Sequence, residues 1–246
     1  HVISSYNNAF NGQLQDIRIS KTAIYTCNFT PPDTLLPTCC PVPVEPACDD
    51  VMLHLQSDTT DSSAAIVDGS GENHVITTHG DTTHSTAETI LGSSSLYFDG
   101  SGDYLHIDQS EILNDVFNIG DDDFTYEFWF RADDLSSGRQ GLMSTHDLPV
   151  SHSNTGGKDA LVIELGQFHP NTTDYSDLWI SFRGVSNMSI QHGETITGLQ
   201  SQTWYHLAVC RHDTLVSVYL NGMFRTSFTK TGGLRTHGLT GTVNPL

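Results

Sequence analysis

Basic residues are scarce in this chain of 246 residues: ten Lys and Arg stand against 29 Asp and Glu, which gives a formal net charge of −19. Nucleic acids and anionic membrane surfaces are polyanions, so this imbalance argues against both as partners. The acidic residues are interpreted first as the solvated surface of an extracellular protein. The alternative is that some of the carboxylates bind a divalent cation.

Long apolar runs and the common catalytic spacings are also missing. No run approaches the roughly 20 apolar residues that a membrane-spanning helix needs, so we expect no membrane insertion. The 13 histidines form no H-E-x-x-H pattern, and no Ser lies in a nucleophile elbow. The chain begins at His1 without an initiator Met or a signal peptide, and we expect it to be a mature or excised piece of a longer protein.

No pair of the five cysteines has C-x-x-C spacing, and no nearby His completes a zinc pattern. Four of them, Cys27, Cys39, Cys40 and Cys48, crowd into a Pro-rich segment, and we predict that they form disulfides in an oxidising compartment. The adjacent pair would each bond elsewhere, for example to the two outer cysteines, but the sequence leaves the connectivity open. Cys210 lies in a predicted strand and is expected to be a buried free thiol; an intermolecular disulfide is the alternative.

Apolar residues alternate along several short runs, which is typical of β-strands. The clearest run is Phe124–Arg131, in which four aromatic side chains share one face at a period of two. Only a second layer can hide such a face, so the sequence predicts a β-sandwich core. The one candidate for a helix is short, at Ser110–Val116. Further strands are predicted at Gln13–Ser20, Val51–Leu55, Val75–Thr78, Ser95–Asp99, Tyr104–Ile107, Met143–His146, Ala160–Leu165, Leu178–Arg183, Trp204–Arg211, Leu215–Leu220 and Met223–Thr229.

Five segments resemble one family of modules. SSLYFDGSGDYLHI at residues 94–107 and DDFTYEFWFR at 122–131 are similar to the laminin G-like, or concanavalin A-like, lectin/glucanase module, in the version repeated in phage tail proteins and large secreted bacterial proteins. WYHLAV at 204–209, VYLNG at 218–222 and FNGQLQDIRI at 10–19 match it too. The resemblance implies an all-β, concanavalin A-like jelly-roll sandwich of two antiparallel sheets. It does not fix the function, because sandwich folds host many functions.

The resemblance also indicates a permuted strand order. The pattern of residues 10–19 belongs to the last strand of the family's module, but here it comes first. We therefore divide the chain into a terminal strand pair at residues 1–20, a linker rich in Pro and Cys at 21–49, and a sandwich at 50–246 that lacks its last strand pair.

Three arrangements can complete this sandwich. Residues 1–20 can end the preceding unit of a covalent tandem array, be donated to the next subunit of a head-to-tail polymer, or fold back onto their own module. Six prolines between residues 31 and 46 predict an extended spacer, which favours the first two. We then expect an extracellular filament, fibre or virion-surface tail whose partners are copies of itself. Alternatively, the permuted order reflects an arbitrary chain boundary.

A calcium site is implied by the same resemblance. Modules of this family often hold one Ca²⁺, and the positions that match its ligands are Asp16, Asp58, Asp99 and Asp103. Ca²⁺ takes about six to eight oxygen ligands, which carboxylates and loop carbonyls supply. The alternative is that Asp99 and Asp103 only accept hydrogen bonds from amides of their own turn.

Carbohydrate binding is the leading alternative to a structural and adhesive function. Sugar-binding sandwiches stack a sugar ring on an exposed Trp or Tyr. Trp129 and Trp179 lie opposite the main apolar face of their strands, and Tyr175 is placed to rim a cleft beside them. The interpretation that we favour for the two tryptophans is a second small core beneath loops.

Three N-glycosylation sequons are present, at Asn28, Asn171 and Asn187. They predict glycan attachment only if the source of the protein glycosylates its secreted proteins.

A glycoside hydrolase is the least favoured function. Laminarinase-type hydrolases on this fold carry E-x-D-x-x-E on one strand, which aims two carboxylates at the scissile bond. This triplet is absent, and Glu127 and Glu164 are each the lone Glu of a predicted strand. We therefore expect no enzyme and assign no catalytic residue.

Overall fold

The computed structural model describes residues 2–3, 9–35, 50–107, 122–136, 138–145, 160–166, 175–183 and 190–231. Every regular element in these ranges is a β-strand, and all the strand pairings are antiparallel. The predicted short helix at Ser110–Val116 lies outside these ranges. Within them, no helix is long and apolar enough to cross a membrane.

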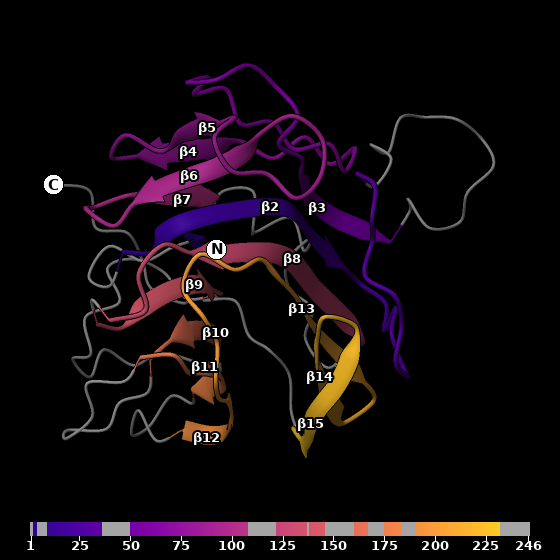
Figure 1. Ribbon diagram of the computed structural model, residues 1–246. Helices are drawn as coiled ribbons and strands as arrows, with labels where there is room; N and C mark the ends of the chain where they lie inside the picture. The colour runs from indigo at the N-terminus through magenta and orange to yellow at the C-terminus, as the bar shows by residue number, and fades with distance from the viewer. Residues whose placement is uncertain are drawn as a thin grey trace, which may run out of the picture.

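The strands form two sheets (Figure 1). One sheet has seven strands in the order β12-β11-β10-β9-β1-β7-β4; the other has eight, in the order β15-β14-β13-β8-β2-β6-β5, with β3 paired to β2 beside this path. The seven-stranded sheet comprises β1 (Val2–Ile3), β4 (Ile76–His79), β7 (Tyr104–Ile107), β9 (Gln140–Ser144), β10 (Ala160–Leu165), β11 (Leu178–Arg183) and β12 (Ile190–Ile196). The eight-stranded sheet comprises β2 (Asn11–Ser20), β3 (Val51–Leu55), β5 (Thr83–Ser85), β6 (Ser95–Asp99), β8 (Phe124–Ala132), β13 (Tyr205–His212), β14 (Leu215–Leu220) and β15 (Met223–Thr229).

One hydrophobic core fills the space between the two sheets, as the alternation in β8 predicts. The four aromatic side chains on one face of β8 are at most 1% exposed. They share a cluster with the inward residues of β10 and β11, among them Ile163 and Phe182. Burial of each such side chain contributes roughly 1.5–3 kcal/mol, so the hydrophobic contact between these faces is the main interaction that holds the sheets together. The four β8 residues are Phe124, Tyr126, Phe128 and Phe130.

The strands β1 and β2 close the sandwich of their own chain. β1 lies between β7 and β9 in one sheet, and β2 lies between β8 and β6 in the other. This is the folded-back arrangement, which the Pro-rich linker was expected to disfavour. Ser20 in β2 pairs with Val51 in β3, so the two ends of the linker lie side by side. In this single chain, β2 therefore reaches its own module.

A β-bulge at Asp16 lets β2 change neighbours. The residues before it, Asn11–Leu14, pair with β6, and the residues after it, Ile17–Ser20, pair with β3, while β8 runs along the other side. Asp16 has a φ of 51°, a left-handed conformation that accommodates the extra residue of a bulge. Beside the bulge, the fully buried side chain of Gln15 bonds to the backbone of loop 90–94.

Candidate functional site

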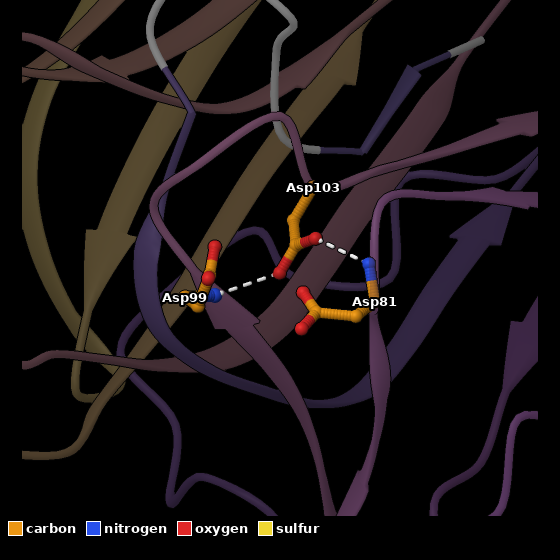
Figure 2. Close-up of side chains that lie close together, drawn as sticks. All are labelled: Asp81, Asp99 and Asp103. Carbon is orange, nitrogen blue, oxygen red and sulfur yellow. Dashed lines mark hydrogen bonds between the residues drawn. The ribbon is translucent and has the colours of Figure 1, made fainter.

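Three carboxylates meet where the turn after β4 approaches the turn after β6 (Figure 2). One carboxylate oxygen from each of Asp81, Asp99 and Asp103 lies within 4.8 Å of the others. The pairing of β4 with β7 brings the two turns together. Gly80 has a φ of +71°, and a Cβ there would lie 2.1 Å from Oδ1 of Asp103, so the close approach of the turns requires glycine.

Asp103 is the buried member of this acidic cluster. Its two carboxylate oxygens accept hydrogen bonds from the backbone N–H of Asp81 at 2.9 Å and of Asp99 at 2.7 Å. Burial raises the pKa of Asp103, the two amides oppose this, and the nearby carboxylates of Asp99 and Asp81 raise it further. A cation placed among the three carboxylates would remove the repulsion between them.

The donor chemistry of the acidic cluster fits Ca²⁺, because hard cations take carboxylate oxygens. The alternative of a hydrogen-bonded turn is visible in the same place, since Asp99 Oδ1 accepts a hydrogen bond from the N–H of Ser101 at 2.6 Å. The two interpretations are compatible, because a carboxylate oxygen that accepts one hydrogen bond keeps a further lone pair.

The other two predicted calcium ligands lie elsewhere. Asp16 is buried at the bulge, and its Oδ1 lies 2.8 Å from Nε2 of the buried His54. Asp58 is exposed and accepts hydrogen bonds from the N–H of Ser93 at 2.9 Å and from its hydroxyl at 2.6 Å. The predicted ligand set is thus corrected: the structure brings Asp99 and Asp103 together with Asp81, which we did not predict.

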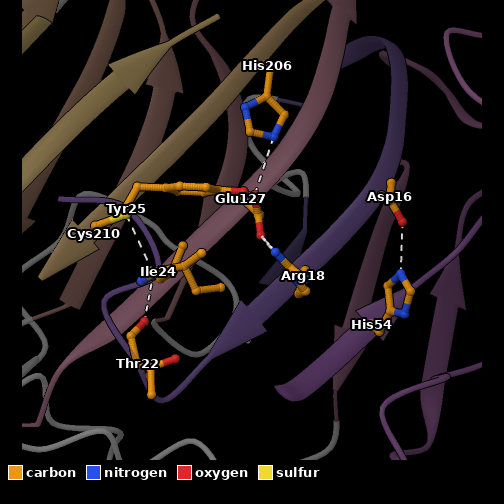
Figure 3. Close-up of polar contacts among 10 residues, drawn as sticks. Asp16, Arg18, Thr22, Ile24, Tyr25, His54, Glu127, His206 and Cys210 are labelled. Carbon is orange, nitrogen blue, oxygen red and sulfur yellow. Dashed lines mark hydrogen bonds and ion pairs between the residues drawn. The ribbon is translucent and has the colours of Figure 1, made fainter. Parts of the chain in front are cut away.

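A second polar cluster lies on the outer face of the eight-stranded sheet, around Glu127 (Figure 3). The carboxylate of Glu127 is 1% exposed. It accepts hydrogen bonds from Nε of Arg18 at 2.6 Å and from the hydroxyl of Tyr25 at 2.8 Å, and Nε2 of His206 lies 3.4 Å away. Burial opposes ionisation, but the bond to His206 and the positive charge of Arg18 outweigh it and lower the pKa of Glu127. Burial, and then the charge of Glu127, raise the pKa of Tyr25.

The beginning of the linker crosses this outer face and covers the cluster. We call residues 21–35 the strap. Tyr25 and Phe29 of the strap stack with ring centroids 3.6 Å apart and pack on a small apolar cluster of Ala208, Cys210 and Tyr219. The predicted spacer is therefore, in its described part, a docked segment.

The predicted glycan-binding residues do not form one site. Trp129 lies on the outer face of the eight-stranded sheet, and Trp179 lies on the outer face of the seven-stranded sheet, because each alternates with residues of the shared core. Trp129 packs edge-on against His206, whose ring also contacts Phe29 of the strap. The indole of Trp129 therefore has an aromatic neighbour on this face, next to the strap.

Trp179 lies among polar side chains. Trp179 is directly opposite Glu164 in the pairing of β11 with β10. Nη2 of Arg139 donates a hydrogen bond to the carboxylate of Glu164 at 2.7 Å. Tyr175 packs close to Gly166 and Arg139, at the same end of β10. The indole N–H of Trp179 and the hydroxyl of Ser181 are both buried without a hydrogen-bond partner among the described residues.

Only part of the predicted modification chemistry falls on described residues. Cys27 is an exposed free thiol and not the disulfide-bonded cysteine that we predicted, whereas Cys210 is buried as predicted. Burial raises the pKa of Cys210 to about 11, which makes that thiol unreactive. Asn28 is exposed, and its side-chain oxygen accepts a hydrogen bond from the N–H of Phe224 at 2.7 Å. The remaining predicted positions, Cys39, Cys40, Cys48, Asn171 and Asn187, lie outside the described residues, so the disulfides and the glycosylation stay predictions.

The acid and nucleophile groups that a hydrolase needs are not paired in the described part of the chain. Glu127 and Glu164 each bind an arginine, and they lie on the outer faces of different sheets. The hydroxyl of Ser57 lies 2.6 Å from Nδ1 of His84, but both side chains are at most 2% exposed. A substrate cannot reach this pair, which instead joins β5 to the segment after β3.

Two solved structures of botulinum neurotoxin resemble this chain distantly. One belongs to work on type C, whose cell entry depends on interaction with two ganglioside molecules; it is 14% identical with a TM-score of 0.44. The other is the binding domain of serotype C1, 15% identical with a TM-score of 0.45. In both cases the match covers 73% of this chain and 38% of the neurotoxin chain, and the likeness is too low to carry a functional argument.

A search of the curated proteins finds no match. The family model Laminin_G_3, described as the concanavalin A-like lectin/glucanases superfamily, matches residues 99–243, which are 145 of the 246 residues. With this match and two antiparallel sheets around one core, the chain belongs to the concanavalin A-like lectin/glucanases superfamily.

Proposed function

We propose that this chain is a non-catalytic, extracellular module with a structural and adhesive role in a filament, fibre or virion-surface tail, in which copies of the chain assemble head-to-tail. The observation that carries the proposal is the central position of β1 and β2 in the two sheets. A sandwich without these strands would expose unpaired backbone in both sheets, which favours pairing with another chain. Strand exchange keeps the contacts of β1, β2 and the strap and changes only which copy supplies them.

The absence of catalysis is supported by the carboxylates. Retaining and inverting glycosidases place two carboxyl groups on either side of one bond, roughly 5–10 Å apart. Here the two strand glutamates are buried in separate arginine pairs on opposite outer faces. Neither is free to act as an acid or a nucleophile toward a shared substrate.

Size-exclusion chromatography with light scattering, followed by electron microscopy, tests the assembly. We expect oligomers or filaments whose fraction rises with protein concentration. A strictly monomeric chain at high concentration would contradict the proposal. Turnover of β-glucans by the purified chain, lost on E127Q or E164Q, would contradict the non-catalytic role.

A calcium site at Asp81, Asp99 and Asp103 is part of the same proposal. Burial of Asp103 beside two further carboxylates supports it, because a divalent cation would neutralise the repulsion there. The ion would tie the turn after β4 to the turn after β6. It would therefore stiffen the seam between the sheets next to β2, which pairs with β6.

Carbohydrate binding is the second candidate function, and one observation favours it. The ring of Trp179 is only partly buried on the outer face of the seven-stranded sheet, opposite Glu164 and near Tyr175, so it offers a surface on which a sugar ring can stack. A glycan array distinguishes the candidates: W179A should abolish binding and W129A, on the opposite face, should not. Binding that depends on Trp129 instead would exclude this site.

A further inference from the structure

The strongest unexplained feature is that two of the three partners of a buried carboxylate come from one end of the chain. We call residues 9–35, which comprise β2 and the strap, the arm, and residues 50–231 the body. Glu127 belongs to the body and is 1% exposed. Its hydrogen-bond donors Arg18 and Tyr25 belong to the arm, and of the three only His206 belongs to the body.

The pair at the centre of this contact also fixes the register of β2. Arg18 and Glu127 are directly opposite each other in the β2–β8 pairing, immediately after the bulge at Asp16. A slip by one residue would turn the side chain of Arg18 to the apolar core and leave Glu127 buried without its main counter-charge. An uncompensated buried charge is strongly unfavourable, so Glu127 stabilises one register of the arm and makes shifted registers unfavourable.

The strap adds contacts with the body along the same face. The hydroxyl of Thr125 accepts a hydrogen bond from the N–H of Ile24 at 2.9 Å and donates one to the carbonyl of Thr22 at 2.7 Å. Further along, the N–H of Phe29 donates to the carbonyl of Gly222 at 2.9 Å. These bonds hold the backbone of the strap along a path from β8 to the β14–β15 turn.

From these contacts we infer that Glu127 is the recognition centre of a docking site for the arm, and that this site takes the arm of a second copy of the chain. The inference rests on the proposed head-to-tail assembly and names its contact residues. The contacts of the arm with its own body show how an arm binds at this site. An Arg on the strand after the bulge and a Tyr seven residues later both form hydrogen bonds with one carboxylate.

The connection between arm and body allows the exchange. Residues 36–49 join them, and four of these 14 residues are proline. At about 3.1 Å per residue, an extended segment of this length spans roughly 40 Å, which is enough to reach a neighbouring copy. Exchange would preserve the bonds of Arg18, Tyr25 and Phe29 and would alter only this connection.

Charge reversal in the full-length chain tests the inference. R18E and E127R each place two like charges at the contact, and we expect the melting temperature of each to fall by at least about 5 °C. When the two variants carry different tags and are refolded together, the smallest closed assembly is a dimer in which each copy seats its arm on the other, and this dimer contains one native pair and one reversed pair. We expect a heterodimer, detected by native mass spectrometry, that melts within a few degrees of the wild type. The double variant R18E/E127R should recover most of the lost stability alone.

The outcomes separate the inference from the proposed assembly. No recovery in the double variant would overturn Glu127 as the recognition centre, whatever electron microscopy shows for the wild type. Recovery in the double variant without heterodimers from the mixed single variants would overturn the exchange. The matched control is the pair R139E and E164R, which lies on the seven-stranded sheet, whereas the arm pairs within the eight-stranded sheet; its mixture should regain no stability, because both residues belong to the body whichever arm is seated there.

A milder set of variants covers the case in which charge reversal yields no soluble protein. Y25F and E127Q each remove one contact without reversing a charge. Mixed with the same chain in a heavy-isotope form, each should exchange subunits several-fold faster than the wild type. Exchange at the wild-type rate would overturn the inference.

Discussion

Asp68 and His74 form a buried pair, with Oδ2 of the aspartate 2.6 Å from Nδ1 of the histidine. Burial alone would raise the pKa of Asp68. Hydrogen bonds from the side chain of His74 and from the backbone N–H groups of His54, Ser70 and His74 outweigh burial and lower the pKa to about 2. The pair holds the segment after β3 against that strand, because Asp68 also bridges to Leu55.

This low pKa predicts a loss of stability in acid. The folded-state pKa of Asp68 is lower than its ordinary value, so its contribution is complete above about pH 4 and disappears as the pH falls toward 2. The contribution is roughly 2 kcal/mol, from about 1.4 kcal/mol per pKa unit. Urea unfolding curves of the wild type and D68N, measured between pH 7 and pH 2, should converge in acid. Curves that stay parallel over this range would show that Asp68 carries no such contribution.

The acidic cluster predicts stabilisation by calcium. Ca²⁺ should raise the free energy of unfolding of the wild type by about 2.7 kcal/mol at 100 times its dissociation constant. The effect should be lost in D81N, because Asp81 supplies one of the three carboxylates. It should be kept in D58N, because Asp58 lies outside the acidic cluster and accepts a hydrogen bond from Ser93 instead. Thermal unfolding with calcium or with EDTA measures it. An equal calcium effect in D81N and the wild type would exclude the site.

The fold could be predicted where the residues of a single strand alternate between apolar and polar. The alternation in Phe124–Arg131 predicted a strand, its buried face and a second layer, and all three are present. Two polar strands, Thr83–Ser85 and Ile190–Ile196, were not predicted, because they lie at or near sheet edges and show little apolar alternation.

The candidate calcium site could be predicted only in part, because the local sequence does not determine which strands pair or in which register. Asp99 and Asp103 share one turn and were found together. Asp81 reaches them only through the pairing of β4 with β7, although the Gly-Asp dipeptide that contains it repeats the one at residues 102–103. Asp16 was misassigned because the bulge directs its side chain to His54.

Gln15 is expected to be the most sensitive buried amide of β2. Its side-chain oxygen accepts hydrogen bonds from the N–H of Ile90 at 3.0 Å and of Leu91 at 3.1 Å, and its nitrogen donates to the carbonyl of Ser94 at 2.7 Å. Q15A would leave these backbone groups unpaired and should cost about 2–4 kcal/mol, at roughly 1–3 kcal/mol for each orphaned group. Urea denaturation measures the loss, with the exposed Q200A as the control. A loss of less than about 1 kcal/mol would mean that loop 90–94 does not depend on Gln15.

Gly222 should be needed for the strap to dock. It has a φ of +72°, and a Cβ there would lie 1.9 Å from the carbonyl oxygen of Phe29. Any L-residue at this φ costs about 1–2 kcal/mol of strain, and G222A would add the clash with the strap. G198A is the matched control, because Gly198 has a φ of +84° and a Cβ added there would meet no described atom within 4 Å.

G222A should therefore destabilise the chain by about 1–3 kcal/mol more than G198A, the range typical of overpacking. Urea denaturation of the two variants measures this difference. Hydrogen exchange should show faster exchange of the Phe29 amide in G222A alone, because that amide donates to the carbonyl of Gly222. Equal losses in the two variants, with the Phe29 amide protected in both, would mean that the strap does not rest on this turn.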